Sequence, residues 1–201
     1  MRAAVRATWV ALVIGGLGAC AGPDEAPSFP HALMTPSPKP LPSAALVHGD
    51  GQPAAPDLVT GRWTWLYFGY ANCPDVCPAA LDFAAREYRK LRHPERVRVV
   101  FVSVDPARDR APKLTQFVQF YHPAFLGVTA DVATIDTLTR AVGASYVIDK
   151  PATPGGSYTV SHSNMVFALD PEGRLGAVYA PEGTPGALAE DFNRLTAKEK
   201  V

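Results

Sequence analysis

Two cysteines, Cys73 and Cys77, are the residues whose type and spacing indicate chemistry most directly. Two thiols at this spacing can form a disulfide or hold one soft metal ion. Thiolate sulfur suits Cu(I), and imidazole nitrogen suits copper in either oxidation state. The pattern is CxxxC, one residue longer than the CxxC of redox motifs, which favours a metal site at least as much as a disulfide catalyst. A local structural disulfide is the third interpretation.

The residues on either side of the cysteines predict a strand that gives way to a helix. The apolar run 63–68 predicts a buried strand, and 79–91 predicts a helix with Pro78 as its first residue. The proline also disfavours helical dihedrals at Cys77. Both thiols would then approach a helix N-terminus, where N–H groups and the helix dipole favour thiolate. A thiol pair in this place is typical of thioredoxin-like proteins.

The rest of the chain predicts an α/β sandwich. Further strands are expected at 97–104, 125–128, 145–148, 164–169 and 175–179, and further helices at 110–121, 132–142 and 185–196. Asp109 and Asp131 are expected to cap two of these helices. Strand–helix–strand crossovers predict parallel pairs. We therefore predict a thioredoxin-like fold, with a central mixed sheet flanked by helices, an extra N-terminal hairpin around 49–52 and a closing hairpin around 170–173.

A third ligand would decide between metal and disulfide chemistry. Of the five histidines, His162 stands out because it comes just before a predicted buried strand. The others fall in a proline-rich segment, by the hairpin turn or directly before prolines: His31, His48, His93 and His122. On position alone, a capping or core role is the commoner interpretation of His162.

Three motifs resemble those of the Sco/SenC family, copper-binding assembly factors for cytochrome c oxidase. They are FGYANCPDVCP at 68–78, VSVDPARD at 102–109 and YTVSHS at 158–163, and they occur in the family's order. The similarity runs from about residue 45 to 195. The resemblance implies that the copper ligands are Cys73, Cys77 and His162. One departure is Ala71, where threonine is expected, at a position that should not touch the metal.

Asp105 has two interpretations. It follows the strand 97–104, which should run parallel to 63–68, so both strand ends would lie at the ligand-binding edge of the sheet. Asp105 would then tune the cysteine loop or help a partner dock; alternatively, it only forms a turn before Pro106. We expect Asp75 to be a first-turn charge, and Tyr70 and Trp65 to be packing residues.

The N-terminus predicts export and anchoring. Arg2 and Arg6 precede an apolar stretch at 9–17, so residues 1–19 are expected to be a signal peptide. Leu-Gly-Ala-Cys at 17–20 resembles a bacterial lipobox, which implies a lipid on Cys20; an ordinary signal peptide or an uncleaved anchor is the alternative. We expect a proline-rich linker over 20–43 and the thioredoxin-like copper-binding domain over 44–201.

These features together predict a carrier. Lys plus Arg equals Asp plus Glu at 19 each. The chain therefore lacks the excess of basic residues that would indicate nucleic-acid binding. We expect a periplasm-facing, membrane-anchored lipoprotein of a bacterial cell envelope. It would pass Cu(I) or Cu(II) to the copper-centre subunit of cytochrome c oxidase, without turnover. Other copper chaperones or thioredoxin-like reductants are further expected partners. The alternatives are a thiol–disulfide oxidoreductase that keeps the oxidase cysteines reduced, and a copper or redox sensor.

Overall fold

The computed structural model describes residues 27–34, 40–48, 51–55, 57–110, 112–149 and 157–198. The strands are β1 Val47–His48, β2 Trp63–Gly69, β3 Val97–Ser103, β4 Leu126–Thr129, β5 Tyr146–Ile148, β6 Val160–His162, β7 Val166–Leu169 and β8 Leu175–Tyr179. The helices are α1 Val76–Tyr88, α2 Lys113–Tyr121, α3 Val132–Val142 and α4 Ala187–Lys198, with a 3-10 turn over Pro94–Arg96. None of the helices in the described part of the chain has the length and apolarity needed to span a membrane. The expected signal peptide and Cys20 lie outside the described residues.

Strands β2 and β3 form the centre of a six-stranded mixed sheet with the order β1-β4-β3-β2-β7-β8. The neighbours β2, β3 and β4 are parallel, whereas β7 runs antiparallel to both β2 and β8. Every residue of β2 is buried, as expected for a central strand covered on both faces. The register pairs Gly69 with Ser103, so the carboxyl ends of β2 and β3 lie at the same edge. The predicted mixed sheet and closing hairpin are confirmed.

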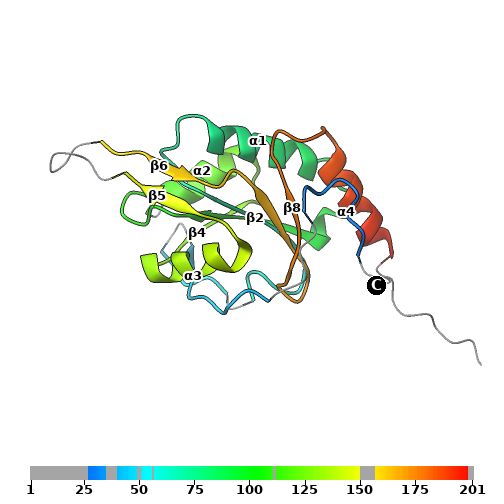
Figure 1. Cartoon of the computed structure of the whole chain (residues 1–201), viewed down its shortest axis with the longest axis horizontal. Helices are drawn as coiled ribbons and strands as arrows, with labels where there is room; N and C mark the ends of the chain where they lie inside the picture. The colour runs from blue at the N-terminus through cyan, green and yellow to red at the C-terminus, as the bar shows by residue number, and fades with distance from the viewer. Residues whose placement is uncertain are drawn as a thin grey trace, which may run out of the picture.

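Helices α1, α2 and α4 cover one face of the sheet, and α3 covers the other (Figure 1). On the first face, the Trp65 ring packs edge-on against Tyr88 of α1 and Phe192 of α4, at centroid distances of 6.2 and 5.2 Å. Aromatic rings favour such edge-to-face contacts. On the second face, Leu138 of α3 lines the same small apolar cavity as Leu66 of β2. The core therefore consists of two layers, one on each face of the sheet.

Strands β5 and β6 form a separate two-stranded antiparallel sheet at one end of the molecule (Figure 1). The strand expected at 145–148 corresponds to β5, whereas β6 is not foreseen from the sequence. Tyr146 in β5 donates a hydrogen bond from its hydroxyl to Asp136 of α3 at 2.7 Å, which ties this small sheet to the body. The register pairs Tyr146 with His162. The small sheet is thus the element that carries the histidine.

Three helices begin elsewhere than predicted, among them α4, which begins at Ala187 and not at residue 185. Helix α1 begins at Val76, so Cys77 is helical and Pro78 lies in the first turn, where its missing N–H removes no intrahelical bond. Helix α2 begins at Lys113 with Pro112 at the N-cap, so Asp109 does not cap it. Helix α3 follows the prediction, because the Thr134 N–H donates to the Asp131 carboxylate at 2.8 Å.

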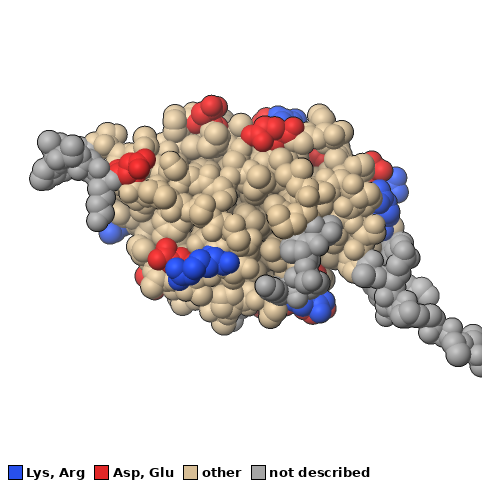
Figure 2. Space-filling model, viewed as in Figure 1, with Lys and Arg blue, Asp and Glu red and all other residues tan. Residues whose placement is uncertain are grey.

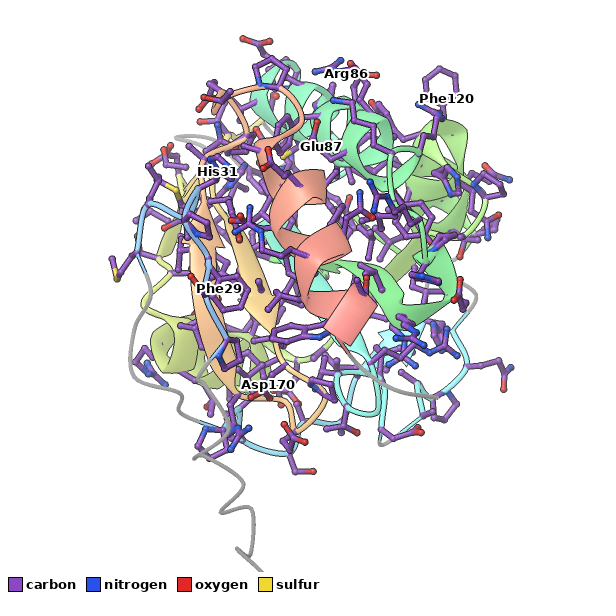
Figure 3. The ribbon with its side chains drawn as sticks, turned by 90° about the vertical axis from the view of Figure 1, so that its right-hand side faces the viewer. Phe29, His31, Arg86, Glu87, Phe120 and Asp170 are labelled. Carbon is purple, nitrogen blue, oxygen red and sulfur yellow. The ribbon has the colours of Figure 1, made fainter. Side chains whose placement is uncertain are left out.

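The segment 27–34, expected within a solvated linker, packs against β8 and α4 (Figure 3). Phe29 is only 7% exposed, and its ring lies 6.1 Å from that of Phe192. The Val178 N–H donates to the Met34 carbonyl at 2.9 Å, so the segment extends the sheet beyond β8. A turn interrupts the extended segment that the prolines predict, because the Ala32 N–H donates to the Phe29 carbonyl at 3.1 Å, and the burial of Phe29 ties the segment to the domain.

The N-terminal hairpin is present in short form. His48 donates its N–H to the carbonyl of Gln52, and Gly51 donates to the carbonyl of His48, both at 2.8 Å. An isolated bridge joins Val47 to Pro53, and β1 itself pairs with β4. The hairpin therefore adds one edge strand to the main sheet.

Charged side chains are scattered over the face shown in Figure 2, with both signs present and no large patch of either. The chain as a whole carries 19 basic and 19 acidic residues. This face therefore offers no single-sign field of the kind that attracts a polyanion.

Candidate metal centre

The cysteine loop leaves the central sheet at the carboxyl end of β2. Gly69 ends this strand, and a Cβ on it would lie 2.8 Å from the Cys77 sulfur and 2.9 Å from the Phe101 ring. Both distances are shorter than side-chain carbons tolerate. The absence of a side chain at Gly69 therefore lets the Cys77 thiol pack directly against the sheet.

Three donor atoms converge beyond this strand end. Cys73 and Cys77 are both free thiols, and both are buried. The Cys77 sulfur lies 3.1 Å from Nε2 of His162, and the Cys77 N–H donates to the Cys73 sulfur at 3.4 Å. All three ligand atoms lie within 4.8 Å of one another. The structure thus brings together the three residues that the resemblance had implied as ligands.

His162 presents the nitrogen that a metal ligand needs. Its Nδ1 lies 3.1 Å from the carbonyl oxygen of Ser163. Because a carbonyl can only accept, Nδ1 carries the proton, and the lone pair of Nε2 points to the thiols. The ring is held edge-on by Tyr67 and Tyr70, at centroid distances of 5.9 and 6.0 Å. The imidazole is therefore fixed in both its tautomer and its orientation.

Burial controls the charge state of the metal-free site. It raises the pKa of the Cys77 thiol far above its usual range. It also lowers the pKa of the His162 imidazole. The pKa of Cys77 is therefore raised and not lowered as its place near the helix N-terminus predicts, and loss of solvation is the largest cause. At neutral pH the site therefore holds a neutral Cys77 thiol that donates to a neutral imidazole.

The donor set fits copper. Two cysteine sulfurs are soft ligands and one imidazole nitrogen is a borderline ligand. Copper binds such ligands well, whereas hard cations such as Mg²⁺ and Ca²⁺ prefer oxygen ligands. An ion with bonds of about 2.0–2.3 Å holds its donors roughly 3–4.5 Å apart. The 3.1 Å separation between Cys77 and His162, within a group spanning 4.8 Å, is close to that arrangement. Small side-chain movements suffice to bring all three atoms onto one ion.

Tyr67 is a neighbour of the site that the sequence did not single out. Its hydroxyl donates to Oδ1 of Asn164 at 2.8 Å, and Asn164 in turn donates to Glu182 at 2.7 Å. Burial raises the pKa of Tyr67, so the phenol stays protonated. This chain of hydrogen bonds fixes the Tyr67 ring that packs against His162.

Asp105 lies at the end of β3 and is fully buried. Its carboxylate accepts a hydrogen bond from the Tyr158 hydroxyl at 2.8 Å and pairs with Arg108. Its described contacts go to these residues and not to the three donor atoms. Asp75 is exposed, and no hydrogen bond of its side chain caps α1.

Asp109 is not the helix cap that its position in the sequence predicts. This residue is fully buried and accepts from the Ala71 N–H and from the Ser103 hydroxyl, each at 2.6 Å. Burial raises the pKa of its carboxyl group. An aspartate before a helical pattern looks like a cap in the sequence, and only the packed fold brings it to the cysteine loop.

The fold and the site together define a thioredoxin-like protein with a Cys–Cys–His donor set, in which both cysteines are buried and the histidine is half-buried. The model of the SCO1/SenC family matches residues 42–197, and the chain belongs to this family. This membership confirms the resemblance seen in the three motifs.

Individual proteins and structures with Sco/SenC names are similar to this chain as well. A protein from Stutzerimonas stutzeri is 34% identical over 155 residues, which cover 75% of this chain and 74% of the relative. Protein SenC of Rhodobacter capsulatus is 35% identical over 141 residues, covering 67% and 60%. Arabidopsis thaliana ScoI, whose crystal structure has copper bound, is 27% identical with a TM-score of 0.68, covering 81% of this chain and 98% of that one. The chain spans 52–61% of the length of the yeast, mouse and bovine SCO2 proteins.

Proposed function

We propose that this protein binds copper through Cys73, Cys77 and His162 and delivers it to the copper-centre subunit of a cytochrome c oxidase. The observation that carries the proposal is the 3.1 Å contact between the Cys77 sulfur and the unprotonated Nε2 of His162. The copper-bound structure of the relative ScoI supports the choice of metal. The oxidase as recipient rests on the family resemblance.

Copper uptake by this site is coupled to proton release. Cys73 and Cys77 each lose a thiol proton when they bind the ion as thiolates, whereas the neutral His162 binds without losing one. Uptake of Cu(I) therefore exchanges one positive charge for two protons. Because a thiol with a raised pKa holds its proton more strongly, affinity rises with pH and transfer is favoured where protons are available.

A carrier role suits these thiols better than a reductase role. A disulfide catalyst attacks through a thiolate at neutral pH, and catalytic cysteines have lowered pKa values. The pKa of Cys77 is raised, and its side chain is completely buried. The reductase remains the second candidate because both thiols are free and adjacent.

We further propose that the protein is held at the envelope membrane by a lipid on Cys20, with the proline-rich residues that follow it as a tether. This part of the proposal rests on the lipobox-like sequence at 17–20. Mass spectrometry of the mature N-terminus tests it: a diacylated Cys20 supports the anchor, and a different mature N-terminus with unmodified Cys20 refutes it.

Copper titration of the reduced full chain tests the central proposal. His162→Ala removes one donor and leaves both thiols, so copper affinity should fall about 10–100-fold or more. The exposed His93 offers a matched control, and His93→Ala should bind copper like the wild type. Oxidation of Cys73 and Cys77 to a disulfide should abolish binding.

The same variants separate the two candidates. His162→Ala should retain thiol–disulfide exchange activity if the protein is a reductase, and should lose oxidase assembly in cells if it is a carrier. Wild-type copper affinity and normal oxidase assembly in His162→Ala would favour the reductase.

A further inference from the structure

A short turn after β3 carries two buried carboxylates. Asp105 and Asp109 are both fully buried. The Asp109 N–H donates to the Asp105 carbonyl at 3.0 Å, which closes the turn. The Ser103 hydroxyl accepts from the Asp105 N–H at 3.1 Å and donates to the Asp109 carboxylate at 2.6 Å. One hydroxyl at the end of β3 thus connects the two acidic residues.

Asp109 reaches the loop that carries the cysteines. Its Oδ2 accepts the N–H of Ala71 at 2.6 Å, two positions before Cys73. The same loop then turns, with the Cys73 N–H donating to the Tyr70 carbonyl at 3.2 Å. The carboxylate of Asp109 therefore fixes the point at which the cysteine loop leaves β2.

Asp105 reaches the segment that carries the histidine. Its Oδ1 accepts from the Tyr158 hydroxyl at 2.8 Å, and its Oδ2 pairs with Nε of Arg108. Arg108 donates from Nη1 to the Tyr158 carbonyl at 2.9 Å, and its guanidinium lies 3.5 Å from the centre of the Tyr158 ring. Tyr158 is therefore held at its hydroxyl, ring and backbone, two residues before β6 begins and four before His162.

We propose that Asp105 and Asp109 are positioning residues that set the two halves of the metal centre separately. Asp109 places the thiols, and Asp105 together with Arg108 places the imidazole. Burial of a carboxylate is unfavourable unless specific partners compensate, which makes a merely space-filling role for either residue a poor explanation. The assignment of these halves to a copper site rests on the proposed function.

Two alanine substitutions in the reduced full chain test this division. Asp109→Ala removes the acceptor for Ala71 and should change the alkylation rate of Cys73 and Cys77 in the metal-free protein, while the NMR signals of the His162 imidazole stay in place. Asp105→Ala should shift and broaden the imidazole signals, while thiol alkylation stays at the wild-type rate. In each variant copper affinity should fall about 10–100-fold, as for other residues that orient metal ligands.

Conservative variants distinguish positioning from general loss of structure. The amide oxygen of Asp109→Asn can still accept from Ala71 and Ser103, so this variant should recover wild-type thiol reactivity. Asp105→Asn should not recover, because a neutral amide loses the charge that pairs with Arg108 and offers one acceptor oxygen where the carboxylate offers two, to Arg108 and to Tyr158. The exposed cap Asp131 supplies the control, and Asp131→Ala should alter neither readout.

With Cu(II), the two halves have separate signatures. Asp109→Ala should change the thiolate-to-copper charge-transfer band, and Asp105→Ala should change the imidazole nitrogen hyperfine coupling. The proposal is overturned if both alanine variants disturb both halves alike, or if neither disturbs its own half. If Asp105→Ala does not fold, Tyr158→Phe removes the hydroxyl bond alone and must still disturb the imidazole signals.

The proposed copper function can fail independently of the positioning proposal. If His162→Ala binds copper normally, the copper proposal is wrong, but the alkylation rates and imidazole signals of the metal-free variants still decide whether the two carboxylates position the two halves.

Discussion

Cys77 is fully buried and His162 is half-buried. Burial raises the pKa of the Cys77 thiol and lowers the pKa of the His162 imidazole, so both side chains are held in their neutral forms. The unfolded chain binds a proton on His162 as the pH falls below about 6.5, while the folded chain resists it. Above about 8.5 the unfolded Cys77 loses its proton, while the folded thiol keeps it. By linkage, the metal-free protein loses stability on both sides of this interval.

The pH dependence of unfolding measures this effect. In urea titrations of the reduced, metal-free protein, the free energy of unfolding should decline below about pH 6.5 and again between about pH 8.5 and 10, before tyrosines titrate. Cys77→Ala should flatten the alkaline decline, and His93→Ala should leave it unchanged. An alkaline decline that is identical in Cys77→Ala would show that another group causes it.

The proposed metal ligands can be recognised in the sequence, whereas the residues that position these ligands cannot. Cys73, Cys77 and His162 stand in recognisable motifs, and the structure brings their donor atoms together. Gly69 and Asp109 carry no such signal. The need for glycine arises from the approach of the Cys77 sulfur, and the partner of Asp109 lies 38 positions away, so neither contact exists before the fold does.

At the scale of elements, the junction between α1 and α4 depends on one buried carboxylate. Glu87 of α1 lies beside the first turn of α4 (Figure 3) and is 1% exposed. It accepts from the Gly186 N–H at 2.8 Å and from the Ala189 N–H at 3.1 Å, and it pairs with Lys90 at 2.7 Å. A side chain from another helix thus satisfies N–H groups that a helix N-terminus leaves free.

Removal of this carboxylate should destabilise the protein without touching the metal centre. Glu87→Ala leaves two N–H groups without their acceptor and should cost about 3 kcal/mol of unfolding free energy, measured in urea. Glu87→Gln keeps one acceptor oxygen and should cost less. The exposed Glu95 is the matched control, and Glu95→Ala should change stability little. A loss below about 0.5 kcal/mol in Glu87→Ala would contradict this account.

Long periodic elements were predictable, and short ones were not. The buried strand that becomes β2 and the helix that becomes α3 follow from apolar pattern and capping, within a residue or two. Strand β6 has only three residues, too few for an alternating pattern to show, and it exists through its pairing with β5. The proline predicts a start of α1 at residue 78, whereas the helix begins at Val76 and Pro78 lies within its first turn.

At the scale of the whole molecule, the N-terminal segment is part of the packed body. Proline-rich composition predicts an extended segment, but it gives no sign of the turn between Phe29 and Ala32, or that a single aromatic residue holds the segment. Phe29 fits beside Trp63 and Phe192, and the His31 N–H donates to the buried Asp191 carboxylate at 3.1 Å (Figure 3). The domain therefore begins to pack well before β1.

Loss of the Phe29 ring should release this segment. Phe29→Ala should cost roughly 3 kcal/mol of unfolding free energy, as for other buried phenylalanines. It should also make residues 27–34 sensitive to limited proteolysis. Met34 is 59% exposed, so Met34→Ala serves as the control and should resist cleavage like the wild type. An unchanged cleavage pattern in Phe29→Ala would mean that hydrogen bonds alone hold the segment.

Because His162 lies on β6, the set of three donor atoms is completed only late in folding. The two cysteines are neighbours in the chain and can meet in a newly made, unstructured polypeptide. The imidazole lies 85 positions from Cys77 and joins the thiols only when the small sheet has docked. Contacts of such sequence separation form late, because they require the closure of a long loop. An immature chain can thus offer copper two sulfurs, and only the completed fold offers three ligands. Under the proposed function, binding through all three ligands would stabilise only the finished fold, so the histidine ligand, and not copper on the thiols alone, would mark completed folding.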